Sequence, residues 1–218
     1  MQPEINGTEI ETIEGWTFRI QPPKVEGGNR LMLLIHGWTG DEQVMNIFAR
    51  QLDTHYWVFF PRGPIKAPSG GFGWAPHGKS LASQTPYLVE NAKELLRVFK
   101  KLLLQKHVDF TPPDLIGFSQ GAALAYTLAV CEPHQTGKVA ALAGFLPDGL
   151  GEFCSLDTLK GKSFYITHGR QDETLPVEEG RKAVDILRTA GANVTYCESD
   201  ATHKVDAKCF NDLNTFFD

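Results

Sequence analysis

The segment best suited to covalent chemistry is Gly117-Phe118-Ser119-Gln120-Gly121, which has the pattern G-x-S-x-G. A short apolar run precedes it and an almost wholly apolar stretch follows, so we expect a tight turn between a strand and a helix. Small residues two positions before and after the serine let such a turn close. The turn holds the hydroxyl clear of the sheet, beside the helix N-terminus. The pattern predicts a nucleophilic serine; the alternative is an ordinary glycine-rich strand–helix turn.

A nucleophilic serine needs a histidine base, and the base needs a carboxylate that orients it. In the chain order serine, acid, histidine, the candidates are Asp172, in a loop after one apolar run, and His203, after the next. Taken alone, Asp172 could cap a helix and His203 could be a surface residue. Glu173 and Asp148 are alternative acids, but Asp172 is favoured because its strand lies one strand–helix unit before the histidine.

Acyl transfer also needs two N–H donors for the oxyanion that develops on the substrate. We expect one from the backbone of Gln120, the residue after the serine. The second is expected from the loop after the early apolar run 31–35, where Gly37 and Gly40 let the backbone turn and offer the N–H of Trp38.

Two further histidines, His36 and His168, each precede a glycine at the end of an apolar run. With Asp172 and His203 they could in principle bind a metal ion, but no H-E-x-x-H or comparable ligand spacing occurs. We expect both imidazoles to hydrogen-bond loops around the site, and we expect neither a metal ion nor a cofactor. His77, in a polar segment, is expected to be solvated.

The elements that must position these residues alternate between short apolar runs and longer segments of helical period. Several runs are apolar on successive residues, as strands buried on both faces of a parallel sheet are. Such alternation predicts an α/β fold with a mostly parallel central sheet and a ligand site beyond the carboxyl ends of its strands. The predicted strands are 31–36, 56–61, 114–118, 139–145, 163–168 and 193–198.

The clearest helix candidate is 86–106, in which Val89, Ala92, Leu96, Phe99 and Leu103 recur at spacings of three and four residues. The alternation around Gly15 predicts an antiparallel hairpin over 9–20 at the sheet edge. The other predicted helices are 120–131, 177–190 and 204–217.

Composition narrows the class of protein. The chain has 218 residues, 42% of them hydrophobic and 22% charged, and its formal net charge is −5. This predicts a single domain over 1–218, and the substrate expected from the candidate triad is a small-molecule ester. The absence of clustered Lys and Arg argues against nucleic-acid binding, and no apolar run is long enough for stable membrane insertion. The oligomeric state stays open between monomer and homodimer.

The four cysteines, Cys131, Cys154, Cys197 and Cys209, are widely spaced and form no C-x-x-C pair. A chain of this length can bury a core without staples, so we expect free thiols in a reducing compartment. The acidic N-terminus lacks the basic and apolar regions of a signal peptide. These observations predict a cytoplasmic protein.

The motifs HGWTGDE at 36–42, GFSQG at 117–121, HGRQDETLPV at 168–177 and THKV at 202–205 together resemble the phospholipase/carboxylesterase family of the α/β-hydrolase superfamily, which includes the acyl-protein thioesterases. The resemblance implies a sheet with helices on both faces and no large cap domain. It also implies a triad of Ser119, Asp172 and His203, with oxyanion donors at Trp38 and Gln120. The chain departs from the family at Thr202, where glycine is frequent.

The resemblance implies a carboxylesterase-type serine hydrolase that acts on small to medium esters. We expect the loop 62–83 and the segment 148–162 to form the pocket walls, with Phe72, Trp74 and Leu175 as candidate substrate-binding residues. Rival functions are an acyl thioesterase or lysophospholipase with the same triad, and a non-catalytic homologue that binds a small ligand.

Overall fold

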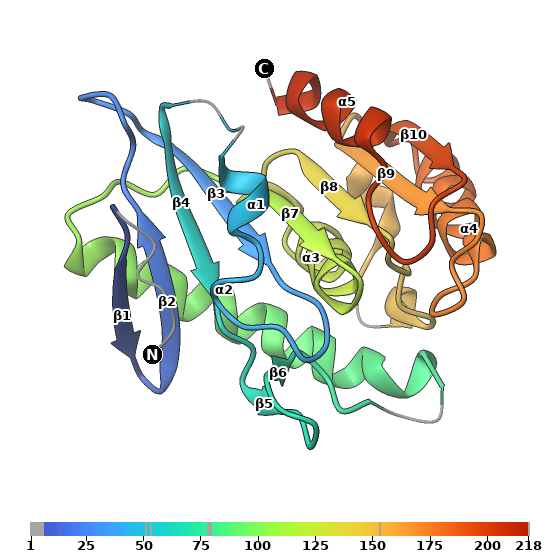
Figure 1. The fold of residues 1–218 in the computed structure, drawn as a ribbon, viewed down its shortest axis with the longest axis horizontal. Helices are drawn as coiled ribbons and strands as arrows, with labels where there is room; N and C mark the ends of the chain where they lie inside the picture. The colour runs from blue at the N-terminus through green and yellow to red at the C-terminus, as the bar shows by residue number, and fades with distance from the viewer. Residues whose placement is uncertain (1–6, 51, 53, 78–79, 153, 218) are drawn as a thin grey trace.

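The computed structural model describes residues 7–50, 52, 54–77, 80–152 and 154–217, and its centre is an eight-stranded sheet (Figure 1). The strand order is β1-β2-β4-β3-β7-β8-β9-β10. The strands are β1 (Glu9–Ile13), β2 (Trp16–Gln21), β3 (Arg30–Ile35), β4 (Tyr56–Pro61), β7 (Asp114–Phe118), β8 (Val139–Leu142), β9 (Ser163–Gly169) and β10 (Asn193–Ser199).

The sheet is parallel from β4 to β10 and antiparallel at its N-terminal edge, where β2 pairs with both β1 and β4. This confirms the predicted α/β fold. The apolar runs form the central strands because a parallel sheet is covered on both faces and its strands carry few polar side chains. The predicted strand 139–145 ends earlier, at Leu142, because Ala143 adopts a positive φ of 46° and turns the chain.

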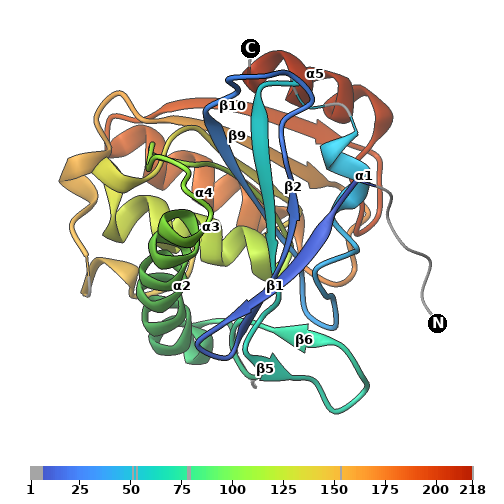
Figure 2. The ribbon, with the colours of Figure 1, turned by 90° about the vertical axis from the view of Figure 1, so that its left-hand side faces the viewer.

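Helices cover both faces of the sheet, as the edge-on view shows (Figure 2). One face carries α2 (Thr85–Gln105), α3 (Gln120–Cys131) and α4 (Val177–Thr189), and the other carries α1 (Asn46–Ala49) and α5 (Ala207–Phe217). Each layer has its own apolar core, one built around Leu96, Leu124 and Phe164, the other around Met32, Tyr165 and Leu213. The helix α3 is buried all round, which is why its sequence shows no polar face.

Two short strands, β5 (Ile65–Lys66) and β6 (Phe72–Gly73), pair with each other outside the main sheet. The carboxyl ends of the parallel strands β3, β7, β9 and β10 all lie at one edge of the sheet. The candidate catalytic and oxyanion-hole residues of the sequence analysis follow these four strand ends.

The prediction of free thiols is wrong, because the four cysteines form two disulfides. Cys131 pairs with Cys154 and Cys197 with Cys209, at Cα–Cα distances of 4.9 and 5.7 Å. The first disulfide joins the end of α3 to the segment after β8, and the second joins β10 to α5. Each pair depends on how a helix packs, which the spacing of the cysteines along the chain does not reveal.

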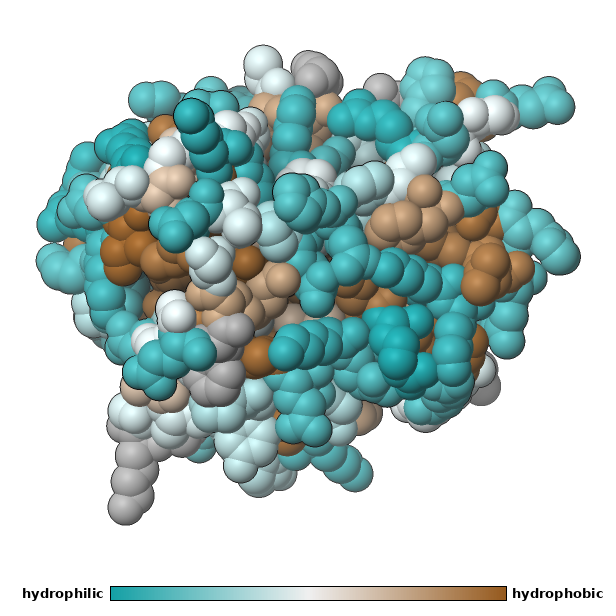
Figure 3. Space-filling model, turned by 180° about the vertical axis from the view of Figure 1, so that it is seen from behind, coloured by the Kyte–Doolittle hydropathy of each residue, from teal (hydrophilic) through white to brown (hydrophobic). Residues whose placement is uncertain are grey.

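No helix among the described residues is long and apolar enough to cross a membrane. On the face opposite to that of Figure 1, the apolar surface forms separate patches set among hydrophilic side chains (Figure 3).

Candidate active site

Ser119 occupies a sharp turn between β7 and α3, with φ of 55° and ψ of −119°. This backbone conformation is costly for a non-glycine residue, by about 1–3 kcal/mol, and is found mainly at functional sites. Neighbouring backbones leave no room for side chains beside it. A Cβ on Gly117 would lie 2.2 Å from the carbonyl oxygen of Gly121, and one on Gly121 would lie 2.2 Å from that of Ile35. The two glycines of the motif are therefore required by the turn itself.

The structure brings Ser119, His203 and Asp172 into one hydrogen-bonded chain. His203 Nε2 lies 3.0 Å from Ser119 Oγ, and His203 Nδ1 lies 2.6 Å from Asp172 Oδ2. An ionised carboxylate can only accept a hydrogen bond, so Nδ1 carries the imidazole proton and Nε2 is free to accept one from the serine. This tautomer is the one that a general base for Ser119 requires.

Asp172 is held by its own loop as well as by His203. Its Oδ1 accepts hydrogen bonds from the backbone N–H groups of Thr174 and Leu175, each at 2.9 Å. Burial acts to raise the pKa of Asp172, but the hydrogen bonds from Leu175, His203 and Thr174 outweigh it and hold the pKa below its usual value. The carboxylate is thus ionised at neutral pH.

The alternative acids do not reach the histidine. Asp148 is partly exposed and pairs with Lys182, and Glu173 is exposed in the loop beside Asp172.

The two expected oxyanion donors belong to segments that adjoin Ser119. Gln120 is the first residue of α3, where a backbone N–H has no intrahelical acceptor. The loop carrying Trp38 passes directly beside the serine, since a Cβ on Gly37 would lie 3.1 Å from Ser119 Cβ. The ring of His77 stacks on Trp38 with centroids 5.7 Å apart, so this exposed histidine also lines the site.

His36 supports this loop and has no nitrogen left for a metal ion. Its Nδ1 donates to the carbonyl of Gly37 at 2.7 Å, and its Nε2 accepts from the N–H of Gly63 at 2.9 Å. Burial lowers the pKa of His36 below its usual value, which keeps the ring neutral and preserves this donor–acceptor pattern.

His168 lies behind the acid. Its Nε2 donates to the carbonyl of Leu175 at 2.9 Å and lies 3.6 Å from Asp172 Oδ2. Among the described residues, no group of three or more His, Cys, Asp or Glu side chains is arranged to hold a metal ion.

The side chain of Gln120 forms a support that the sequence does not reveal. Its Oε1 accepts from the backbone N–H of Trp74 at 2.7 Å, and its Nε2 donates to the carbonyl of Ala75 at 2.9 Å and to Gln84 Oε1 at 2.7 Å. The indole of Trp74 in turn donates to the carbonyl of His36 at 2.7 Å. These bonds tie the loop after β6 to Gln120 and to His36, which begins the loop that carries Trp38. The G-x-S-x-G motif predicts a role only for the backbone N–H of Gln120, not for its side chain.

A pocket of about 980 Å³ opens at Ser119 and His203 and has mainly apolar walls. The walls come from the loop before α1, from α1 itself, from the segment just before α2, and from the chain between His203 and the first turn of α5. Representative side chains are Val44, Phe48, Leu81, Phe145, Val205 and Phe210. This arrangement fits an apolar group bonded to the carbonyl that the serine would attack.

The predicted wall residues are only partly found there. Leu175 lines the pocket, but Phe72 and Trp74 are not among the described residues that do. Trp74 is fully buried behind the site, and Phe72 lies under the guanidinium of Arg62. Residues of the loop 62–83 contribute, as expected. The described part of 148–162 does not, because Cys154 and Leu159 pack toward the far end of α3.

Comparisons with known proteins agree with this architecture. Residues 17–218 match the model of a family described as Phospholipase/Carboxylesterase. The curated relative "Acyl-protein thioesterase 1" of Kluyveromyces lactis is 33% identical over 100 residues, so the match spans 44% of each chain.

Two solved structures share the fold over almost their whole length. A carboxylesterase of Bacillus cereus has a TM-score of 0.82 at 21% identity, covering 94% of both chains. A carboxylesterase of Mesorhizobium loti has a TM-score of 0.84 at 18% identity, covering 97% of this chain and 99% of the other. With a family match over almost the whole chain, the protein belongs to the phospholipase/carboxylesterase family of α/β-hydrolases.

Proposed function

We propose that the protein cleaves carboxylic esters of small to medium acyl or alcohol groups through an acyl-enzyme on Ser119. The observation that carries this proposal is the hydrogen-bonded chain from Ser119 through His203 to Asp172 at the mouth of an apolar pocket. A serine in this setting has both the base it needs and a substrate cavity beside it.

The reaction follows from the geometry. Ser119 Oγ attacks the ester carbonyl carbon while its proton passes to His203 Nε2, and Asp172 stabilises the imidazolium. The negative charge on the former carbonyl oxygen is bound by the N–H groups of Trp38 and Gln120. The intermediate collapses, and the alcohol leaves with the proton from His203. Water then attacks the acyl-serine, with His203 again taking the proton, and the carboxylic acid and free serine result.

A thioester substrate is the second candidate, because the relative from Kluyveromyces lactis is named an acyl-protein thioesterase. Thioesters and lysophospholipids would use the same triad and pocket. A cytoplasmic location stays a prediction, but one of its arguments no longer holds, because disulfides persist mainly in oxidising compartments.

The test is a panel of p-nitrophenyl esters of graded acyl length, run beside an acyl-CoA and a lysophosphatidylcholine. We expect kcat/KM to rise about fourfold for each methylene group until the pocket is filled, since each buried methylene contributes about 0.8 kcal/mol. Treatment with a chelator should leave the rates unchanged.

Ser119→Ala should abolish turnover of every substrate. Ser80→Ala is the matched control, because Ser80 also lines the pocket but has no histidine partner in the structure. Equal loss in both variants, or activity that persists in Ser119→Ala, would show that Ser119 is not the nucleophile. A parent protein that turns over none of these substrates would instead favour ligand binding without catalysis.

A further inference from the structure

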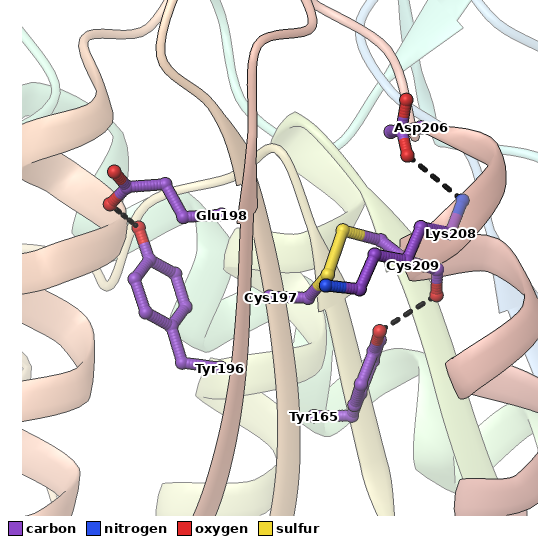
Figure 4. Close-up of a disulfide and its surroundings, with 7 residues drawn as sticks. All are labelled: Tyr165, Tyr196, Cys197, Glu198, Asp206, Lys208 and Cys209. Carbon is purple, nitrogen blue, oxygen red and sulfur yellow. Dashed lines mark hydrogen bonds between the residues drawn. A yellow bond between two sulfur atoms is a disulfide. The ribbon is translucent and has the colours of Figure 1, made fainter.

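The disulfide between Cys197 and Cys209 encloses the loop that carries His203. Cys197 lies in β10 and Cys209 in the first turns of α5, twelve residues further along, with His203 midway between them. Figure 4 shows the bridge between the strand and the helix, with Tyr196 and Glu198 pointing to the other side of β10. The bridge therefore fixes both ends of the segment that presents the histidine to Ser119.

The first half of this loop is held by the neighbouring loop that carries Asp172. The backbone N–H of Arg170 donates to Ser199 O at 2.7 Å, and that of Gln171 donates to Ala201 O at 3.0 Å. These bonds fix the chain up to Ala201, two residues before the histidine.

The second half depends on the start of α5. The backbone bonds there are local, from Lys204 to Thr202 and from Phe210 to Asp206, and the side chain of Asp206 accepts from the N–H of Lys208. Local bonds of this kind shape the turn but do not attach it to the sheet. Apart from the contact of the His203 ring with Phe118 and the partial burial of Val205 against the core, its position is set by how the first turn of α5 is anchored.

Cys209 is that anchor. It is 1% exposed, whereas Ala207 and Lys208 before it are exposed, so it is the first residue of α5 to reach the core. Its carbonyl accepts from the hydroxyl of Tyr165 at 2.7 Å, and its sulfur is bonded to Cys197. Leu213 and Phe217 hold the later turns of the helix in the core.

We propose that Cys197 and Cys209 are positioning residues whose disulfide holds His203 in line with Ser119 and Asp172, and that reduction of this bond lowers activity reversibly. The proposal rests on the proposed function for its activity readout. With the bond reduced, Leu213 and Phe217 keep α5 folded while its first turn and the loop gain freedom. The pocket residues Val205 and Phe210 move with that turn.

The reduction balances with a dithiol as the reductant. One thiolate attacks the sulfur of Cys197, because this residue is 9% exposed and Cys209 only 1%, and Cys209 leaves as a thiolate. The second thiolate of the reagent then displaces Cys197 and closes a cyclic disulfide. Two electrons and two protons pass to the protein, which ends with two thiols.

The other disulfide provides a matched control. Cys131 lies at the far end of α3 from Ser119, a distance of about 18 Å along a helix of this length. It joins α3 to Cys154 and does not touch the loop of His203. Loss of this bond should reduce stability without displacing the histidine.

The experiment compares Cys197→Ala/Cys209→Ala with Cys131→Ala/Cys154→Ala. For the first variant we expect kcat on a p-nitrophenyl ester to fall about 10–100-fold, because a displacement of about 1 Å at a reacting group has an effect of this size. The second variant should stay within about threefold of the parent. Far-UV circular dichroism should show both to be folded at the assay temperature.

A spectroscopic readout separates positioning from general stabilisation. The proton between His203 Nδ1 and Asp172 should give a far-downfield proton NMR signal, which its loss in Asp172→Asn would assign. The signal should broaden or disappear in Cys197→Ala/Cys209→Ala and persist in the control. This signal does not depend on turnover, so it still tests the proposal if Ser119→Ala shows that the proposed hydrolysis is wrong.

If Cys197→Ala/Cys209→Ala does not fold, the control Cys131→Ala/Cys154→Ala can test the same bond. This variant keeps the disulfide between Cys197 and Cys209 and has lost the other one. Dithiothreitol added to the folded control should lower activity and weaken the signal, and reoxidation should restore both. The proposal is overturned if the signal and kcat are unchanged by loss of this bond, or if both double variants lose activity equally.

Discussion

His203 Nδ1 lies 2.6 Å from Asp172 Oδ2, whereas Asp148, the alternative acid that follows β8, pairs with Lys182 at the surface. The carboxylate of Asp172 also receives two backbone N–H groups, so its orientation does not depend on the histidine. A fixed, ionised carboxylate is what selects the imidazole tautomer that can accept a proton from serine.

Asp172→Asn should therefore lower kcat by about 10³–10⁴-fold, since the amide favours the wrong tautomer of His203 without removing the loop's hydrogen bonds. The measurement is steady-state hydrolysis of a short p-nitrophenyl ester. Asp148→Asn and Glu173→Gln are the matched controls and should stay within about tenfold of the parent. A large loss of activity in Asp148→Asn, together with an active Asp172→Asn, would show that Asp148 and not Asp172 is the acid.

Gln120 should contribute to stability through its side chain as well as to the site through its backbone. Gln120→Met keeps the shape but leaves Trp74 N–H, Ala75 O and Gln84 Oε1 without their partner. Each buried polar group left unpaired should lower the free energy of unfolding by about 1–3 kcal/mol.

Urea unfolding checks this, with Gln105→Met, at an exposed position of α2, as the control. We expect kcat to fall as well in Gln120→Met, because the loop that packs behind Gln120 and His36 is released. Equal stability of the two variants would show that the buried network contributes nothing.

The buried neutral His36 predicts a dependence of stability on pH. Its folded-state pKa is lowered, so below the unfolded-state value of about 6.5 the unfolded chain binds a proton that the folded protein does not. The contribution of His36 is present above that pH and is lost as the pH falls toward the folded-state pKa.

The midpoint of urea unfolding, measured between pH 7.5 and 5, should fall more steeply for the parent than for His36→Gln. The variant should be the less stable of the two at pH 7.5, because it loses the bonds to Gly37 and Gly63. Parallel pH curves for the two proteins would contradict this role of the histidine.

Much of the fold could be predicted because its local patterns are strong. The central strands are continuous apolar runs, and Val89, Ala92 and Leu96 repeat at the period of the helix α2 that contains them. The candidate site could be placed because each of its residues follows the end of a strand, and parallel strands bring those ends to one edge.

Features that depend on tertiary packing were not predicted. The short helix α1 has too few residues to show a period, so its apolar side chains Ile47 and Phe48 gave no sign of lining the pocket. An aromatic residue in a glycine-rich loop can face the substrate or the core, and Trp74 faces the core. The side-chain network of Gln120 joins segments that only the folded chain brings together.

The disulfides also depend on tertiary packing and were not predicted. They determine how many thiol groups the protein exposes before and after reduction. The denatured, unreduced protein should show almost no reaction with a thiol reagent, and all four cysteines should react after reduction. Four reactive thiols in the unreduced protein would restore the original expectation from the sequence.

Covalent labelling shows whether Ser119 is the nucleophile without relying on a chosen substrate. A fluorophosphonate reacts with a serine only where a base activates it, and mass spectrometry locates the adduct. We expect a single adduct on the peptide that contains Ser119 and none in Ser119→Ala. An adduct at another residue, or an active Ser119→Ala protein, would show that Ser119 is not the nucleophile.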